Sequence, residues 1–295
     1  MYLLKKIIFT PILKILSWLP LSILRNIGAI IGVLAFKFSK KGVDRLKNNL
    51  ITTGMCSEKD VESMAKATAI ELGKTLIETV CIAWHRSREY NAGFFKRAIN
   101  FEIVKLAYDE NKPIIFLTPH IGNFEMAVKY TANRIKRNFT ILYKPSKDKW
   151  FNEMMLNGRT EDNIIPVPTS RQGILSLVKS LRNKEIIGML PDNVASMGDG
   201  VWVNFFGKKV FATILAAKMM SYNEAKTFLV ASYRVKNGFE IEYIPFSVDS
   251  KDVKVIMQSM YNEFEKMILK APTEYFWVYN RFRIPKHASL DTIQE

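Results

Sequence analysis

The residues best suited to chemistry are a histidine and a glutamate five positions apart, His120 and Glu125. A neutral imidazole can take a proton from a hydroxyl, and a carboxylate can fix its tautomer and stabilise the imidazolium. On one continuous helix, at about 100° per residue, the two side chains would point about 140° apart. They can therefore meet only if His120 lies in a loop and Glu125 lies in the first turn of the next helix.

The flanking sequence can supply that arrangement. Residues 113–118 form an apolar run rich in β-branched and aromatic residues, which predicts a buried strand ended by a Thr-Pro pair. A turn element at Gly122-Asn123 and a helical pattern over residues 124–135 follow. An ordinary loop histidine beside a solvated glutamate would give the same spacing. Sites in open α/β sheets gather at the carboxyl ends of strands, however, so this position favours a functional pair.

Helical and strand patterns alternate along most of the chain. Strands are predicted at residues 114–117, 139–143, 164–167, 186–190, 227–233 and 239–243. Helices are predicted at residues 57–86, 101–110, 124–135, 149–156, 173–181, 213–220 and 251–269. This alternation predicts an α/β fold with a mainly parallel central sheet flanked by helices.

The net charge of +15, from 43 basic and 28 acidic residues in 295, suits an anionic membrane, an acidic protein or nucleic acid. No nucleic-acid-binding module is recognisable, so we expect no nucleic-acid partner. The two cysteines, Cys56 and Cys81, and the three scattered histidines lack metal-ligand spacing. The chain also lacks a glycine-rich nucleotide loop and a Gly-x-Ser-x-Gly elbow, and we expect neither a metal nor a cofactor.

The N-terminus differs from the rest of the chain. Residues 7–24 and 26–36 are mostly apolar, yet nine basic residues and one acidic residue, Asp44, lie within residues 1–47. This region is too long and too interrupted for a secretory signal. Two interpretations stay open: one tilted membrane span with snorkelling basic residues, or helices lying in the membrane interface. A buried hairpin of a soluble fold is less favoured, because it would not gather this much charge.

We therefore divide the chain into a membrane anchor helix or helical hairpin over residues 1–42 and an α/β domain over residues 43–295. The basic cluster at residues 37–47 favours the cytoplasmic side of the membrane for the second part.

Several short motifs occur in a fixed order around these elements. The first is His-Ile-Gly-Asn-Phe-Glu at residues 120–125, and the others are Tyr143-Lys-Pro, Gly158-Arg159, Leu-Pro-Asp192, Gly-Val-Trp-Val-Asn-Phe-Phe-Gly at residues 200–207, and Glu-Tyr-Phe-Trp277 with Arg281. Together they resemble the late acyltransferases of lipid A biosynthesis, of the lauroyl and myristoyl type. That family belongs to the glycerolipid acyltransferase superfamily, whose mark is His, four residues, then Asp or Glu. The resemblance covers nearly the whole chain.

The resemblance implies a glycerolipid acyltransferase-like fold and a set of catalytic roles. His120 would be the general base, oriented by Glu125. It would activate a hydroxyl of a lipid A precursor, which attacks the acyl thioester of an acyl carrier protein. Arg159 would be the first candidate to stabilise the oxyanion, and backbone N–H groups at the helix start near Gly122-Asn123 the second. Asp192 would support the site, holding Arg159.

The same resemblance implies substrate contacts and a location. The residues expected to bind substrate are Asn123, Tyr143, Lys144, Asp192 and Arg281. Trp202, Phe205 and Phe206 would line an acyl pocket or, more simply, belong to the core. The partners would be acyl carrier protein, a lipid A precursor and membrane lipid, on the cytoplasmic face of a bacterial inner membrane.

Two other functions fit the sequence. One is the same chemistry on a glycerophospholipid or a glycolipid acceptor. The other, of a different class, is a basic membrane-tethering protein without catalytic activity.

Overall fold

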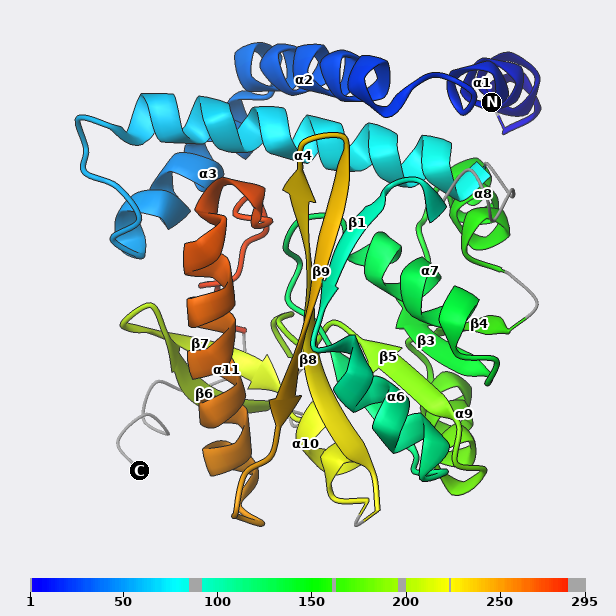
Figure 1. The fold of residues 1–295 in the computed structure, drawn as a ribbon. Coiled ribbons are helices and arrows are strands. Elements are labelled where there is room, and N and C mark those ends of the chain that lie inside the picture. The colour runs from blue at the N-terminus through cyan, green and yellow to red at the C-terminus, as the bar shows by residue number, and fades with distance from the viewer. Residues whose placement is uncertain (1, 85–91, 161–162, 196–199, 223, 286–295) are drawn as a thin grey trace.

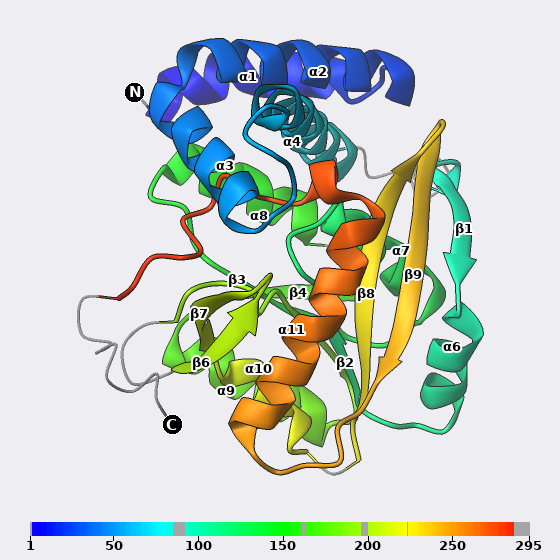
Figure 2. The same ribbon diagram turned by 90° about the vertical axis from the view of Figure 1, so that its left-hand side faces the viewer.

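The computed structural model describes residues 2–84, 92–160, 163–195, 200–222 and 224–285. Seven strands form one central sheet in the order β1-β9-β8-β2-β5-β3-β4, and a separate antiparallel pair, β6 and β7, lies beside it (Figures 1 and 2). The strands are β1 (Phe95–Ile99), β2 (Ile114–Leu117), β3 (Phe139–Tyr143), β4 (Ile164–Pro168), β5 (Ile186–Met189), β6 (Gly200–Phe205), β7 (Lys208–Thr213), β8 (Lys226–Val235) and β9 (Gly238–Phe246).

Every pairing in the central sheet is parallel except that of β8 with β9, which is antiparallel. The predicted mainly parallel sheet is therefore confirmed. The helices of the described residues are α1 (Tyr2–Leu16), α2 (Leu21–Phe38), α3 (Lys40–Thr52), α4 (Val61–Trp84), α6 (Phe101–Asp109), α7 (Phe124–Arg134), α8 (Lys149–Arg159), α9 (Arg171–Arg182), α10 (Leu215–Met220), α11 (Val253–Lys270) and the 3-10 turn η1 (Pro272–Glu274).

Strand β2 lies in the middle of the sheet and is buried on both faces. Ile114 and Phe116 pack into a core with side chains of α6 and α7, whereas Ile115 and Leu117 pack into the larger core beneath α9, α10 and α11. A strand covered on both sides reads as a continuous apolar run instead of an alternating one. This explains why residues 113–118 carry so strong a strand signal.

Helix α2 packs on α4 through glycines. A Cβ atom at Gly28 would lie 2.6 Å from the Cα of Lys74, and one at Gly32 would lie 2.3 Å from the carbonyl oxygen of Ala69. On the α4 side, a Cβ at Gly73 would lie 2.1 Å from the carbonyl oxygen of Gly28. The two backbones therefore touch, and no larger side chain fits between them.

Within the described residues, α2 is the one helix long and apolar enough to cross a membrane. That is weak support for a span, because the face with Gly28 and Gly32 is already buried on α4. Helix α1 has no buried residue and rests against α8 through Phe9–Trp150 and Lys6–Glu153 contacts. Both helices expose large apolar side chains, among them Leu3, Leu4, Ile7, Ile12, Ile15, Ile23, Ile30, Leu34 and Phe38.

Candidate active site

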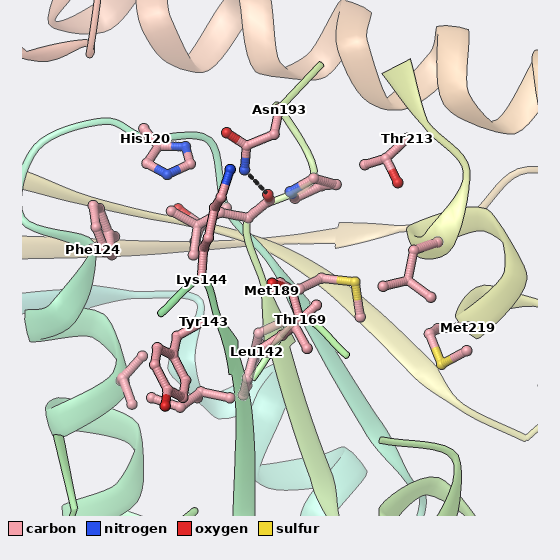
Figure 3. Close-up of a pocket in the computed structure, with 18 of the residues that line it drawn as sticks. His120, Phe124, Leu142, Tyr143, Lys144, Thr169, Met189, Asn193, Thr213 and Met219 are labelled. Atoms are coloured by element: carbon pink, nitrogen blue, oxygen red, sulfur yellow. Dashed lines mark hydrogen bonds between the residues drawn. The ribbon is translucent and has the colours of Figure 1, made fainter. Parts of the chain in front are cut away.

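A cavity of about 880 Å³ opens where β2, β3 and β5 end. His120 and Glu125 line it, together with Tyr143, Lys144 and Arg159. Figure 3 shows His120, Phe124 and Tyr143 on one side of this cavity. Because the three strands are parallel neighbours, their carboxyl ends bring residues from separate parts of the chain to one edge of the sheet.

The histidine is held by Asp192, not by Glu125 as its sequence position predicts. Nδ1 of His120 lies 2.5 Å from Oδ1 of Asp192, and the backbone N–H of His120 donates to Oδ2 at 3.0 Å. The predicted His120–Glu125 pair is therefore wrong as a direct contact. The physical reason is the sheet order: β2 and β5 are adjacent, so the loops that follow them meet.

Asp192 is a fully buried carboxylate with further partners. Tyr275 donates its hydroxyl to Oδ2 at 3.0 Å, and the guanidinium of Arg281 lies 3.1 Å from the same oxygen. Burial alone would raise the pKa of Asp192, but the charges of His120 and Arg281 outweigh it and hold this pKa well below its usual range. An ionised Asp192 accepts from Nδ1–H of His120, which leaves Nε2 with the free lone pair.

Glu125 instead pairs with Arg159. Nε and a terminal nitrogen of Arg159 donate to the same oxygen of Glu125 at 2.8 and 2.5 Å. Glu125 is the second residue of α7 and Arg159 is the last of α8, and both side chains line the cavity. The expectation that Asp192 holds Arg159 is wrong. Arg159 pairs with Glu125, and Asp192 pairs with Arg281.

The loop between β2 and α7 is fastened by its backbone. The N–H of Gly122 donates to the carbonyl of Glu274, and that of Asn123 donates to the carbonyl of Ser232, both at 3.1 Å. Gly122 has a φ of +56°, and a Cβ there would lie 2.0 Å from the Ser232 oxygen, so only glycine fits. These two amides are already occupied, so of the backbone donors expected at the helix start near them, those in the first turn of α7 remain. The amides of Phe124 and Glu125, in the first turn of α7, lack intrahelical acceptors.

The predicted substrate-binding residues divide into two groups. Tyr143 and Lys144 line the cavity, as expected of substrate contacts. Asn123, Asp192 and Arg281 are buried: Asn123 donates to Glu78, and Asp192 and Arg281 form an ion pair, so the three support the site from behind.

The aromatic residues of the motif at residues 200–207 are core, not pocket. Phe205 packs with Tyr261 and Tyr275, Phe206 packs on Trp277, and Trp202 packs on Phe211. None of the three aromatic residues of the motif lines the described cavity. The simpler of the two expectations for them is therefore the one the structure supports.

Comparisons with known proteins give the family of this chain. The family model for bacterial lipid A biosynthesis acyltransferases matches residues 3–284. The chain belongs to this family. It is 21% identical to the lipid A biosynthesis lauroyltransferase of Escherichia coli K12 over 278 residues, which is 92% of this chain and 89% of that relative. It is 22% identical to the palmitoleoyltransferase of the same strain over 275 residues, which covers 90% and 86% of the two chains.

A third relative, a lipid A biosynthesis acyltransferase of Haemophilus influenzae, is 24% identical over 277 residues and is covered to 86% of its length. The match extends from α1 to the last described segment, so the N-terminal helices belong to the family match as well. The suspected family is thus confirmed, and the protein is an acyltransferase by class.

The apolar lining of this acyltransferase's cavity comes from both core layers of the sheet. Phe116, Phe139 and Val230 belong to the core beneath α6 and α7. Met189 and Met219 belong to the core beneath α9 to α11. In Figure 3, Met219 and Thr213 lie opposite His120 across the cavity, and Lys144 lies between. Sequence reasoning missed this division, because it depends on which side of each strand faces which helix layer.

A buried acid behind the His120 loop makes stability depend on pH. Burial and the neighbouring Glu71 and Glu78 raise the pKa of Glu274 from 4.5 to about 7, although Arg234 opposes the shift. The folded state therefore keeps a proton that the unfolded state loses between about pH 5 and pH 7. Stability due to this group falls as pH rises through that window, by on the order of 3 kcal/mol.

We expect Glu274→Gln to remove that part of the pH dependence. Urea denaturation of the wild type and the variant at pH 5 and pH 8 measures it, as the difference between their two changes. Glu263→Gln is the matched control, because Glu263 lies in an exposed pair with Lys266 and should keep the wild-type pH dependence. Equal pH dependence in wild type and Glu274→Gln would contradict the assignment.

Proposed function

We propose that this protein transfers a fatty acyl chain from an acyl carrier protein thioester to a hydroxyl of a lipid A precursor. The observation that carries the proposal is the buried Asp192 that holds Nδ1 of His120 at the mouth of a cavity lined by Arg159. The family supplies the reaction class and the lipid A context. The acyl carrier protein as donor is our proposal.

The proton path follows from the histidine's tautomer. Nε2 of His120 takes the proton from the acceptor hydroxyl as its oxygen attacks the thioester carbonyl carbon. The imidazolium is stabilised by Asp192, which stays ionised. When the C–S bond breaks, the departing thiolate takes the proton from Nε2 and leaves as a thiol. The ester bond has then formed, the thioester bond has broken, and His120 is neutral again.

The tetrahedral intermediate needs hydrogen-bond donors for its oxygen. Arg159 uses two of its donor groups on Glu125 and has one terminal nitrogen left over. The ion pair fixes the guanidinium beside the cavity, so that its remaining N–H groups face a developing charge without reorganisation. The free amides at the start of α7 are a second source of donors. Glu125 thus acts through Arg159, not through His120.

Cations around the cavity favour a phosphorylated substrate. Lys144, Lys218 and Arg283 line it and are exposed, and no ion pair to any of them is present among the described residues. Both proposed substrates carry phosphate: the acceptor on its sugars, and the donor on the arm that bears the thioester. An excess of unpaired positive charge raises the local concentration of such ligands.

The outward faces of α1 and α2 support attachment to the cytoplasmic surface of a membrane. They expose apolar side chains such as Ile7, Ile30 and Phe38, among the basic residues of the N-terminus. The inward face of α2 is occupied by α4, which carries the buried acid Glu78. A spanning α2 would therefore draw α4 into the bilayer, and we favour helices lying in the interface.

The test of this function is mass spectrometry of lipid A from cells with and without the protein. A mass difference of one acyl group, reproduced by the purified protein with acyl carrier protein and the precursor, is the expected result. A change confined to glycerophospholipids would move the proposal to that acceptor. No change in any lipid would contradict it.

The Glu125–Arg159 pair gives a prediction of its own. Glu125→Gln and Arg159→Ala should each lower kcat by about 10²- to 10³-fold, because each loses the positioned donor. The double variant should be little worse than either single one, since residues that act as a unit are not additive. Steady-state kinetics of the three variants measure this. Additive losses, or an effect of Arg159→Ala confined to KM, would contradict the oxyanion role.

A further inference from the structure

Behind the His120 loop lies a group of buried charges that the proposed mechanism does not use. Glu78 on α4 is fully buried and accepts from Nε of Arg25, on α2, at 2.6 Å. The two terminal nitrogens of Arg25 donate to the carbonyls of Val235 and Gly238 at 2.6 and 2.7 Å. One guanidinium therefore joins α2, α4 and the turn between β8 and β9.

Two routes lead from Glu78 to the loop. Directly, Nδ2 of Asn123 donates to Glu78 at 3.4 Å, and the hydroxyl of Thr79 donates to the Asn123 side-chain oxygen at 3.4 Å. Each of these bonds is long, so neither fixes the loop alone. Asn123 is fully buried and directly precedes α7, which begins with the residues that line the cavity.

The second route passes through Arg234. Its side chain donates to both oxygens of Glu78 at 3.0 to 3.2 Å, and its backbone N–H donates to Glu274 at 3.2 Å. The carbonyl of Glu274 in turn accepts from Gly122 in the loop. Loss of Arg25 would leave Arg234 as the one remaining cation that the structure pairs with the buried Glu78, so we expect the group around the loop to rearrange.

We propose that α2 is part of the catalytic unit and that its Arg25 is a positioning residue, which holds the loop at residues 120–123 through Glu78. The backbones of α2 and α4 pack closely at Gly28 and Gly32, which keeps Arg25 beside Glu78. The predicted domain boundary at residue 42 would then divide a single functional unit. The inference rests on the proposed acyl transfer for one of its two readouts.

The test compares two charge deletions on the same helix. Arg25→Ala removes the bonds that join α2 to Glu78 and to the β8–β9 turn, whereas Lys37→Ala removes an exposed charge near the end of α2. We expect Arg25→Ala to lower kcat by about 10- to 100-fold, the range for small misplacement of catalytic groups, with little change in KM. Amide hydrogen exchange in a peptide spanning residues 118–127 should also become faster in this variant. Lys37→Ala should match the wild type in both measurements.

A conservative variant keeps the test decisive if Arg25→Ala does not fold. Arg25→Lys retains the charge but loses the fork that reaches two carbonyls, and it should give an intermediate kcat and intermediate exchange. Equal behaviour of the Arg25 variants and Lys37→Ala, or a change in KM alone, would overturn the inference. If the wild type transferred no acyl group, the proposed function would fail, and hydrogen exchange alone would still decide the role of Arg25.

Discussion

We expect His120→Ala to lower kcat for acyl transfer by about 10³-fold, while the protein remains folded and attached to membranes. Removing a positioned general base typically costs about 10²- to 10⁴-fold. The loss should be in this range because Nε2 is the one group in the proposed path that takes the acceptor proton. The measurement is turnover with acyl carrier protein and the lipid A precursor, alongside the melting temperature and the fraction that sediments with membranes.

The control for this variant lies at the opposite end of the sheet. Asn138 directly precedes β3, and its exposed side chain bonds Glu185. Asn138→Ala should keep full turnover. Near-normal turnover in His120→Ala would defeat the assignment of the base, whatever the effect on stability.

Asp192→Asn is the second large effect. An amide at this position can present its N–H₂ group to the ring and so stabilise the wrong tautomer, with the proton on Nε2. We expect kcat to fall by about 10³- to 10⁴-fold, because the same change in a serine-protease triad costs about 10⁴-fold. The measurement is kcat as a function of pH for the wild type and the variant. The variant should lose the part of kcat that requires a neutral, correctly oriented histidine.

The same variant also affects stability. Arg281 is 3% exposed and pairs with Asp192, so Asp192→Asn leaves a buried guanidinium without its counter-charge. Breaking a buried pair from one side costs about 3–5 kcal/mol. Arg281→Met in the Asp192→Asn background should recover stability without recovering turnover, which separates the two effects. If Glu125→Gln changed the pH profile of activity more than Asp192→Asn, that result would contradict Asp192 as the residue that orients His120.

Local patterns identified the elements that carry the site. The strand at residues 114–117 and the strand at residues 139–143 match β2 and β3, because both are apolar runs bounded by strong turn residues. The edge strand β1 was missed. Its sequence, Phe-Lys-Arg-Ala-Ile, exposes two charges, which suits an edge but hides the strand pattern. The β6–β7 hairpin was missed as structure and seen only as a motif.

The partner of His120 could not be found from spacing. Asp192 is 72 residues away in the sequence, and the two meet only because β5 lies beside β2. Glu125 was the nearer carboxylate, and proximity along the chain favoured it. The sequence does contain a signal for Asp192. Leu-Pro-Asp follows one buried strand just as Thr-Pro-His follows another, and functional sites gather at the carboxyl ends of such strands.

The N-terminal segment was correctly expected to be helical and apolar, but its packing was not foreseen. Gly28 and Gly32 are four residues apart, a spacing that puts two small residues on one face of a helix. In membranes such faces pack helix on helix. Here the partner is α4, so the small residues mark a contact within the protein.

The hydrogen bonds between Asp192 and His120 bear on the order in which the two substrates bind. The Asp192 carboxylate binds both the ring and the backbone N–H of His120, so the imidazole is held in one position. In the proposed path the acceptor oxygen attacks the thioester directly, and no acyl group is held covalently on the protein. The attacking oxygen and the departing sulfur therefore both have to lie within reach of Nε2 of His120 at the same time. Such an enzyme must collect both substrates before it turns over, and its initial-rate plots should intersect instead of running parallel.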